Sequence, residues 1–314
     1  MSPDLILAID QGTTGSTCLL VDTSYRVLAR ATHEFPQHFP KPGWVEHDPE
    51  ELYASVLHAI VDVLGKSDAP VGRIAAIGIT NQRETSLLWD RATGVPLHRA
   101  LVWQDRRTAD TCEALKAAGH EARVRALTGL VLDPYFSGTK LAWVLDHVEG
   151  ARTRAERGEL AAGTVDTYLL WRLTGGAEHA TEPSNASRTL LWPLAGGGWS
   201  EELCALFRVP QAILPRVQPC AGEFGRTRGV PGLPDGIPIC GIAGDQQSAL
   251  FGQACFGPGQ AKCTYGTGAF ALLNTGSRVV SSEHGLLSTV AWQLGDVTTY
   301  CLEGSSFMAG AVVQ

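Results

Sequence analysis

A short turn rich in glycine and threonine joins two apolar runs close to the start of the chain. The runs cover residues 5–9 and 18–21, and the segment between them reads Asp10-Gln11-Gly12-Thr13-Thr14-Gly15-Ser16. A strand, a tight polar turn and a second strand predict a β-hairpin. The Walker loop and the dinucleotide fingerprint lead from a strand into a helix instead. The chain satisfies neither pattern, so its first unit must be built around an antiparallel pair.

The same turn carries groups that bind phosphates and cations. Backbone N–H groups in such a turn point inward and form an anion cradle, and the hydroxyls of Thr13 and Thr14 add donors. Gly12 and Gly15 are expected to supply backbone angles that other residues avoid. Asp10 offers a hard oxygen ligand for a divalent cation. The turn therefore indicates nucleotide chemistry, and an ordinary hairpin turn is the alternative interpretation.

A second segment repeats this pattern far along the chain. Residues 261–265 lead into Gly266-Thr267-Gly268, and an apolar run at 269–273 follows. Two similar hairpins in one chain predict two related domains that grip one phosphate chain from opposite sides. This arrangement resembles the ATPase fold shared by actin, Hsp70 and the sugar kinases.

Composition bounds the class of protein. A chain of 314 residues is long for one domain and comfortable for two. Its net charge of −7 comes from mixed acids and bases, without a block of like charge that would indicate a nucleic-acid partner. Its apolar stretches are too short for a membrane span. The eight cysteines lack zinc-like spacing, and the start of the chain lacks the pattern of a secretory signal. We therefore expect a cytoplasmic protein.

Strand and helix patterns alternate along the chain, which favours an α/β fold. A helix should begin after Asp48, because an N-cap residue, a proline and two acids follow one another there. Nearly continuous apolar strands are predicted at 74–80 and 237–243. Further helices are predicted at 108–118, 139–148 and 162–173, and loops at 175–200 and 229–238. A domain boundary is predicted near residue 253, which gives domains at 1–252 and 253–314.

Polar side chains gather where the predicted strands end. Arg83 and Glu84 follow one buried strand, and Asp245 follows another. Ligands of open α/β sheets bind outside such carboxyl ends. Forked donors and carboxylates, with Trp103 and Tyr135 as apolar walls, suit a small ligand with several hydroxyl groups. Taken singly, the residues have simpler interpretations: a surface ion pair for Arg83–Glu84, core aromatics for Trp103 and Tyr135, and an N-cap for Asp245.

Together these segments resemble the FGGY family of carbohydrate kinases, and within it the members that act on glycerol. The resemblance covers essentially the whole chain. Eight blocks carry it in order, at residues 10–14, 41–49, 75–85, 129–140, 163–167, 185–189, 241–247 and 264–268. It implies an actin-like (ribonuclease H-like) ATPase fold with a nearly complete first domain and a partial second domain.

The resemblance also implies an activity and a set of site residues. The activity is ATP-dependent phosphorylation of glycerol to sn-glycerol 3-phosphate with Mg²⁺, the first step of glycerol catabolism. Asp245 is implied as the catalytic base. The residues implied to contact glycerol are Arg83, Glu84, Trp103, Tyr135, Asp245, Gln246 and Phe270. The residues implied at the nucleotide are Thr13, Thr14, Gly15, Thr17, Thr267, Gly310 and Gln314, with Asp10 at the metal.

The chain departs from the family pattern in three places. Thr17 stands where many members carry an arginine that neutralises phosphates. The stretch 231–237 lacks the arginine of a regulatory loop found in some members. Members also extend beyond residue 314, so strands within 261–302 are expected to lack partners. The alternatives are a kinase of another polyol or ketose, or a truncated scaffold without turnover. A homo-oligomer is expected for the full-length form.

Overall fold

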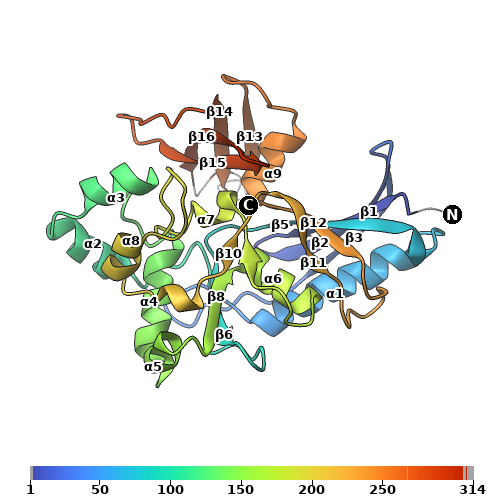
Figure 1. Cartoon of the computed structure of the whole chain (residues 1–314), viewed down its shortest axis with the longest axis horizontal. Coiled ribbons are helices and arrows are strands. Elements are labelled where there is room, and N and C mark those ends of the chain that lie inside the picture. The colour runs from blue at the N-terminus through green and yellow to red at the C-terminus, as the bar shows by residue number, and fades with distance from the viewer. Residues whose placement is uncertain (1–2, 267, 307–308, 310–314) are drawn as a thin grey trace.

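The computed structural model describes residues 3–266, 268–306 and 309. Three sheets with helices beside them make up most of it, which confirms the predicted α/β class (Figure 1). In the described part of the chain, no helix combines the length and the apolar character needed to cross a membrane.

The largest sheet contains the predicted opening hairpin. Its strand order is β11-β12-β5-β1-β2-β3. β1 pairs antiparallel with β2 and parallel with β5, and β5 pairs parallel with β12. The bounds are β1 Leu5–Gln11, β2 Gly15–Asp22, β3 Val27–Glu34, β5 Ile74–Asn81, β11 Ala221–Arg226 and β12 Pro238–Gly244. The parallel strands β1, β5 and β12 end at the same edge, which brings the polar segments after them together.

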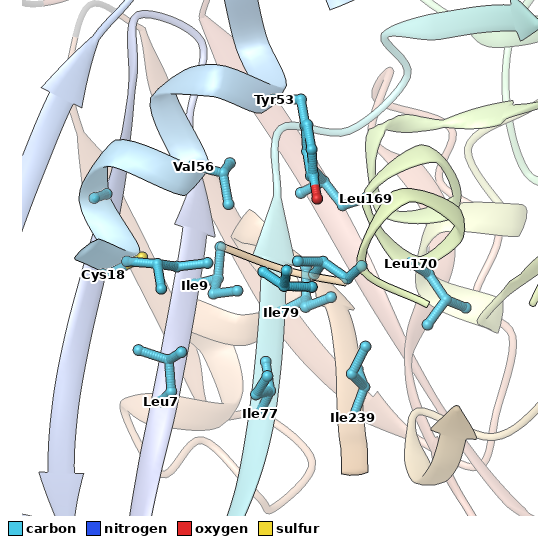
Figure 2. Close-up of a cluster of buried hydrophobic side chains, with 14 of the residues drawn as sticks. Leu7, Ile9, Cys18, Tyr53, Val56, Ile77, Ile79, Leu169, Leu170 and Ile239 are labelled. Atoms are coloured by element: carbon cyan, nitrogen blue, oxygen red, sulfur yellow. The ribbon is translucent and has the colours of Figure 1, made fainter. Parts of the chain in front are cut away.

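Helices α1 (Pro49–Gly65) and α6 (Val165–Leu173) cover one face of this sheet. Figure 2 shows apolar side chains from β1, β5, β12 and both helices meeting in one core, including Leu7, Ile77 and Ile239. Asp48 caps α1 as predicted, because its carboxylate accepts hydrogen bonds from the first backbone N–H groups of the helix. The core fixes the strand ends that carry the polar residues.

A second, smaller sheet has the order β4-β7-β6-β8, with five helices beside it. Its strands are β4 Glu46–His47, β6 Ser86–Asp90, β7 Ala100–Leu101 and β8 Leu160–Thr164. The helices are α2 Ala109–Ala117, α3 Glu121–Thr128, α4 Ser137–His147, α5 Ala151–Glu156 and α8 Glu201–Leu206. The predicted helices at 108–118 and 139–148 are confirmed. The start of the predicted helix at 162–173 was wrong, because residues 162–164 pair with β6 as part of a buried strand.

The third sheet contains the predicted second hairpin. Its order is β13-β14-β16-β15, next to helix α9. The bounds are α9 Asp245–Gly252, β13 Ala261–Tyr265, β14 Ala269–Gly276, β15 Leu287–Leu294 and β16 Val297–Ser306. In Figure 1 these orange and red strands lie beside α9, which follows directly from β12 of the first sheet. The expectation that the strands within 261–302 lack partners was wrong, because they pair with one another.

The segment 175–200, predicted as a loop from its small polar residues, is deeply buried over 180–192. It holds the short strand β9 (Ala180–Thr181), which pairs with β10 (Arg216–Val217), and the one-turn helix α7 (Pro183–Ala186). Its polar groups bond to each other and to neighbours, as in the paired amides of Asn81 and Asn185. The remaining short elements are the 3₁₀ turns η1 Val71–Arg73 and η2 Gln211–Ile213.

Candidate active site

A cavity of about 380 Å³ lies where the ends of the first sheet meet the second hairpin. We call it the site cavity. Its lining contains every residue that was predicted to contact a polyol: Arg83, Glu84, Trp103, Tyr135, Asp245, Gln246 and Phe270. Thr13 and Thr14 from the first hairpin turn border it, as do Thr264, Gly266 and Gly268 from the second. The structure therefore brings the predicted polyol residues and both hairpin turns to one place.

Arg83 and Glu84 enter the cavity because the chain turns sharply after β5. The Thr85 N–H donates to the carbonyl of Arg83 at 2.7 Å, and Glu84 between them has a φ of 60°. This is a γ-turn with its central residue in the left-handed region, a strained conformation for a residue with a side chain. Neighbouring side chains alternate in a strand, but here Arg83 Nε and Glu84 Oε1 are 3.9 Å apart. The simpler interpretation as a surface ion pair was wrong, since both residues are buried.

A network of buried side chains with alternating positive and negative charges lies beneath the cavity. Both terminal nitrogens of Arg83 donate to Glu303 of β16, at 2.5 and 3.1 Å. Arg188 donates to Glu303 at 2.9 Å and to Glu84 at 2.6 Å. Arg83 Nε lies 3.3 Å from Asp245 Oδ1. Buried charges are tolerated when they are paired in this way, so the network fixes the polar floor of the cavity.

The pKa values in this network follow from burial and from the opposite charges. Burial alone would raise the pKa of Glu303, but Arg188 and Arg83 outweigh it and hold that pKa at about 2. Burial raises the pKa of Glu84, with Arg83 and Arg188 opposing the rise. Burial also raises the pKa of Asp245, and Arg83 opposes that rise. Asp245 therefore binds a proton more readily than an ordinary aspartate does.

Asp245 presents its carboxylate to the cavity from the first turn of α9. Its Oδ1 accepts a hydrogen bond from the Gln246 N–H at 2.7 Å, and its Oδ2 accepts one from Gln246 Nε2 at 3.3 Å. Gly244, not Asp245, is the N-cap of the helix. A Cβ atom on Gly244 would lie 2.7 Å from the Arg83 side chain, so only glycine leaves room for the arginine there. The side chain of Asp245 is 35% exposed and can meet a ligand.

Aromatic side chains form the apolar walls. The Trp103 ring meets Tyr135 and Phe270 edge to face, with ring centres 5.8 and 6.0 Å apart. Trp103 Nε1 donates to the Thr13 hydroxyl at 2.9 Å, which ties the wall to the first hairpin turn. The interpretation of Trp103 and Tyr135 as core aromatics is incomplete, because both border the cavity while packing against the protein.

The first hairpin turn needs Gly15 for a reason other than the one predicted. Neither Gly12 nor Gly15 has a positive φ. A Cβ atom on Gly15 would instead lie 2.9 Å from the carbonyl oxygen of His33 in β3, so close strand approach requires the glycine. The position of Thr267, Gly310 and Gln314, predicted at the nucleotide, lies outside the described residues.

Asp10 and Thr17 lie in a neighbouring cavity of about 630 Å³, over the face of the first sheet that α1 leaves uncovered. The two residues oppose each other in the β1–β2 pair. The Asp10 side chain is exposed on this face, but partial loss of hydration and then the charge of Asp245 raise its pKa to about 6, and Arg30 on the rim of the same cavity opposes this rise. Asp10 is thus placed where a cation would stabilise it.

Within the described residues, no group of three His, Cys, Asp or Glu side chains is arranged to hold a metal ion. Magnesium in phosphoryl-transfer sites takes one or two carboxylates and completes its shell with phosphate oxygens and water. A single carboxylate at Asp10, beside the first hairpin turn with its predicted phosphate-binding groups, fits that pattern.

Sequence reasoning missed three charged residues of the site: Arg188, Lys262 and Glu303. Arg188 lies in the segment predicted as a loop. It also lies within residues 185–189, one of the eight blocks that carry the family resemblance, but no role was assigned to it. Lys262 alternates in β13 with Ala261 and Cys263, so the sequence pattern alone would place the lysine toward solvent, whereas the structure buries it. Glu303 lies in β16, for which no motif was recognised.

Comparison with known proteins agrees with this geometry. The N-terminal domain of the FGGY family of carbohydrate kinases matches residues 5–252. A glycerol kinase from Myxococcus xanthus is 59% identical over 311 residues, which is 98% of this chain and 63% of that protein. The chain therefore spans less than two thirds of the length of this curated relative.

Solved structures show the same fold. The Plasmodium falciparum glycerol kinase with ADP superposes with a TM-score of 0.94 and 36% identity, over 99% of this chain and 63% of that one. The xylulose kinase from Rhodospirillum rubrum has a TM-score of 0.86 and 22% identity, over 98% of this chain and 62% of that one, which speaks for the fold alone. These matches confirm the predicted actin-like ATPase fold, with the second domain present in part.

Proposed function

Because the chain belongs to the FGGY family of carbohydrate kinases, we propose that the protein carrying it phosphorylates glycerol with ATP to give sn-glycerol 3-phosphate. One observation carries the proposal: Arg83, Glu84 and Asp245 form the floor of a small cavity that both hairpin turns border. The glycerol kinases similar to this chain support glycerol as the acceptor, and the ADP in the Plasmodium structure supports ATP as the donor. We further propose that residues 1–252 form the first ATPase domain and 253–314 the opening of the second.

Glycerol fits the chemistry of the site cavity. Its three hydroxyl groups need donors and acceptors, which Arg83, Glu84 and the Gln246 amide supply, while Trp103 and Phe270 cover its CH₂ groups. The charged groups are already held by Glu303 and Arg188. Binding therefore requires little ordering of side chains, which favours affinity for a small ligand.

Asp245 acts as the general base. A glycerol hydroxyl next to its carboxylate gives up its proton while the oxygen attacks the γ-phosphorus. The bond from that phosphorus to the bridging oxygen breaks, and ADP leaves with the electron pair. Burial raises the proton affinity of Asp245 and Arg83 opposes that rise, so the carboxylate can orient the hydroxyl and accept its proton. Phosphoryl transfer depends mainly on such positioning and on charge neutralisation.

The hairpin turns hold the phosphates. Backbone N–H groups and the Thr13 and Thr14 hydroxyls come from one side, and Gly266 and Gly268 from the other. Asp10 would hold Mg²⁺, which neutralises phosphate charge when bound. Thr17 adds no charge here; its hydroxyl lies 2.9 Å from that of Thr32.

Asp245→Asn tests the assignment of the base. The variant keeps the shape of the side chain and removes the proton acceptor, so turnover should fall ~10²–10⁴-fold while glycerol affinity changes much less. The rate is measured as glycerol-dependent ADP formation by the full-length protein that contains this chain. ³¹P spectra identify the phosphorylated compound. Near-normal turnover of the variant would contradict the assignment. A wild-type protein that phosphorylates a larger polyol or a ketose in preference to glycerol would contradict the substrate.

A further inference from the structure

Lys262 lies directly behind the site cavity and contacts three of its lining residues. The neighbours of Lys262 in β13 face outward, but the lysine points inward and is 7% exposed. A lysine is rarely buried to this extent without partners. Its position therefore calls for an explanation in terms of the groups around it.

The three N–H donors of the Lys262 ammonium group have three acceptors. These are Oε1 of Gln246, the Thr264 hydroxyl at 2.8 Å and the Phe270 carbonyl oxygen at 3.3 Å. Gln246, Thr264 and Phe270 all line the site cavity, and they come from α9, β13 and β14. One side chain thus links the second hairpin to the helix that carries Asp245.

The contact with Gln246 decides which way its amide faces. An ammonium group donates and cannot accept, so the amide oxygen must be the atom that faces Lys262. The amide NH₂ group then faces the opposite way, where Nε2 lies 3.3 Å from Asp245 Oδ2. With the lysine absent, either end of the amide could face the carboxylate, and an oxygen there would repel it.

Charge balance supports the same role. Glu84, Asp245 and Glu303 contribute three negative charges, and Arg83 and Arg188 contribute two positive ones. The ammonium group of Lys262 brings the cluster to neutrality. Burial and then the charge of Arg83 lower the pKa of Lys262 to about 8, while Asp245, Glu303 and Cys263 oppose the shift.

We propose that Lys262 is a positioning residue that fixes the amide orientation of Gln246 and, through it, the carboxylate of Asp245. This inference rests on the proposed roles of Asp245 and Gln246. It also means that the base is correctly oriented only when β13 is docked against α9, so the second hairpin completes the site.

A double-mutant cycle tests the route through Gln246. Lys262→Met keeps the length of the side chain and removes its donors. It should lower kcat/KM for glycerol roughly 10–100-fold, the range seen for residues that orient metal ligands. In a Gln246→Ala background the same substitution should have almost no effect, because coupled residues are not additive. Lys116→Met, at a half-buried lysine far from the cavity lining and paired with Glu113, is the matched control and should keep full activity. A full loss that persists in the Gln246→Ala background would overturn the inference.

A second readout needs no turnover. In ¹⁵N spectra, the side-chain amide signal of Gln246, identified by its loss in Gln246→Ala, should shift as the pH passes through about 8 and Lys262 loses its proton. The shift should vanish in Lys262→Met, whose circular dichroism should match the wild type. A Gln246 signal that does not move between pH 6 and 10 would contradict the inference, whatever the protein phosphorylates. A moving signal in a protein that leaves glycerol unphosphorylated would contradict the proposed function alone.

Discussion

The two hairpins that border the site cavity are held in place by different forces. The first, β1–β2, packs Leu7, Ile9 and Leu20 into a large apolar core under α1. The second, β13–β14, turns one side of its edge strand to solvent, and Tyr265 there is 79% exposed. Few apolar residues back it, including Phe270 and Leu272 in a small cluster. The sheet that contains this hairpin contacts residues 1–252 through buried charged groups, Lys262 of β13 and Glu303 of β16.

The two kinds of contact contribute differently to the site. Apolar burial stabilises without choosing a direction, which suits the rigid base of the site. Charged hydrogen bonds contribute less net stability but fix geometry. Glu303 holds both arginines of the floor, and Lys262 holds Gln246. The third sheet is therefore docked by contacts that also shape the catalytic groups.

The largest effect should come from Glu303→Gln. The substitution removes the charge shared by Arg83 and Arg188 and leaves two buried guanidinium groups under-compensated. Losing one partner of a buried ion pair costs about 3–5 kcal/mol of unfolding free energy. Glu202→Gln is the matched control, because Glu202 makes a similar two-point contact with Arg123 at the surface. Denaturant unfolding should show a much smaller loss for that control, because an exposed ion pair contributes little to stability. Equal losses in the two variants would contradict the role of the buried charges.

The same two variants can be compared by measuring how the free energy of unfolding depends on pH. The pKa of Glu303 is about 2 in the folded protein, below its ordinary value of 4.5. The folded state therefore binds fewer protons than the unfolded state between these values. The stability that Glu303 contributes is complete above pH 5 and is lost as the pH falls towards 2. Glu303→Gln should flatten this part of the acid unfolding curve, and Glu202→Gln should leave it largely unchanged.

The apolar clusters behind the two hairpins should differ in how much free energy of unfolding is lost when a buried leucine is truncated, and this difference should be smaller than the one above. Leu7 and Leu272 are both fully buried, one in each hairpin. Replacing a buried leucine by alanine costs about 2–5 kcal/mol, depending on how far the surroundings collapse. Leu7→Ala should fall in the upper half of this range, because its core is surrounded by strands and helices. Leu272→Ala should fall in the lower half, since its small cluster can relax. A larger loss for Leu272→Ala in denaturant unfolding would reverse the comparison.

The sequence predicted what depends on local pattern. Both hairpins, helix α1 and the polar ends of β5 and β12 follow from apolar runs and the turn residues after them. Arg83, Glu84 and Asp245 were found because ligands bind beyond such strand ends. The simpler interpretation of Arg83–Glu84 as a surface pair failed, because local sequence does not show that Arg188 and Glu303 compensate them.

The residues that were missed depend on tertiary contacts. Small polar residues over 175–200 are typical of exposed loops, but here they bond to one another and can be buried. Arg188 is visible as part of the site only once this segment is known to pack beneath Glu84. Glu303 and Lys262 act across the boundary predicted near residue 253, where no local pattern links the two sides.

Calorimetric titration with glycerol tests the central claim most directly. The wild-type protein should bind one glycerol per chain in the site cavity. Arg83→Ala and Glu84→Ala should each weaken binding by ~1.5–3 kcal/mol, the value of hydrogen bonds to charged groups, or roughly 10–150-fold in Kd. Each variant should be shown to remain folded by circular dichroism. Unchanged glycerol affinity in both folded variants would contradict the claim that this buried charge network forms the floor of a glycerol site.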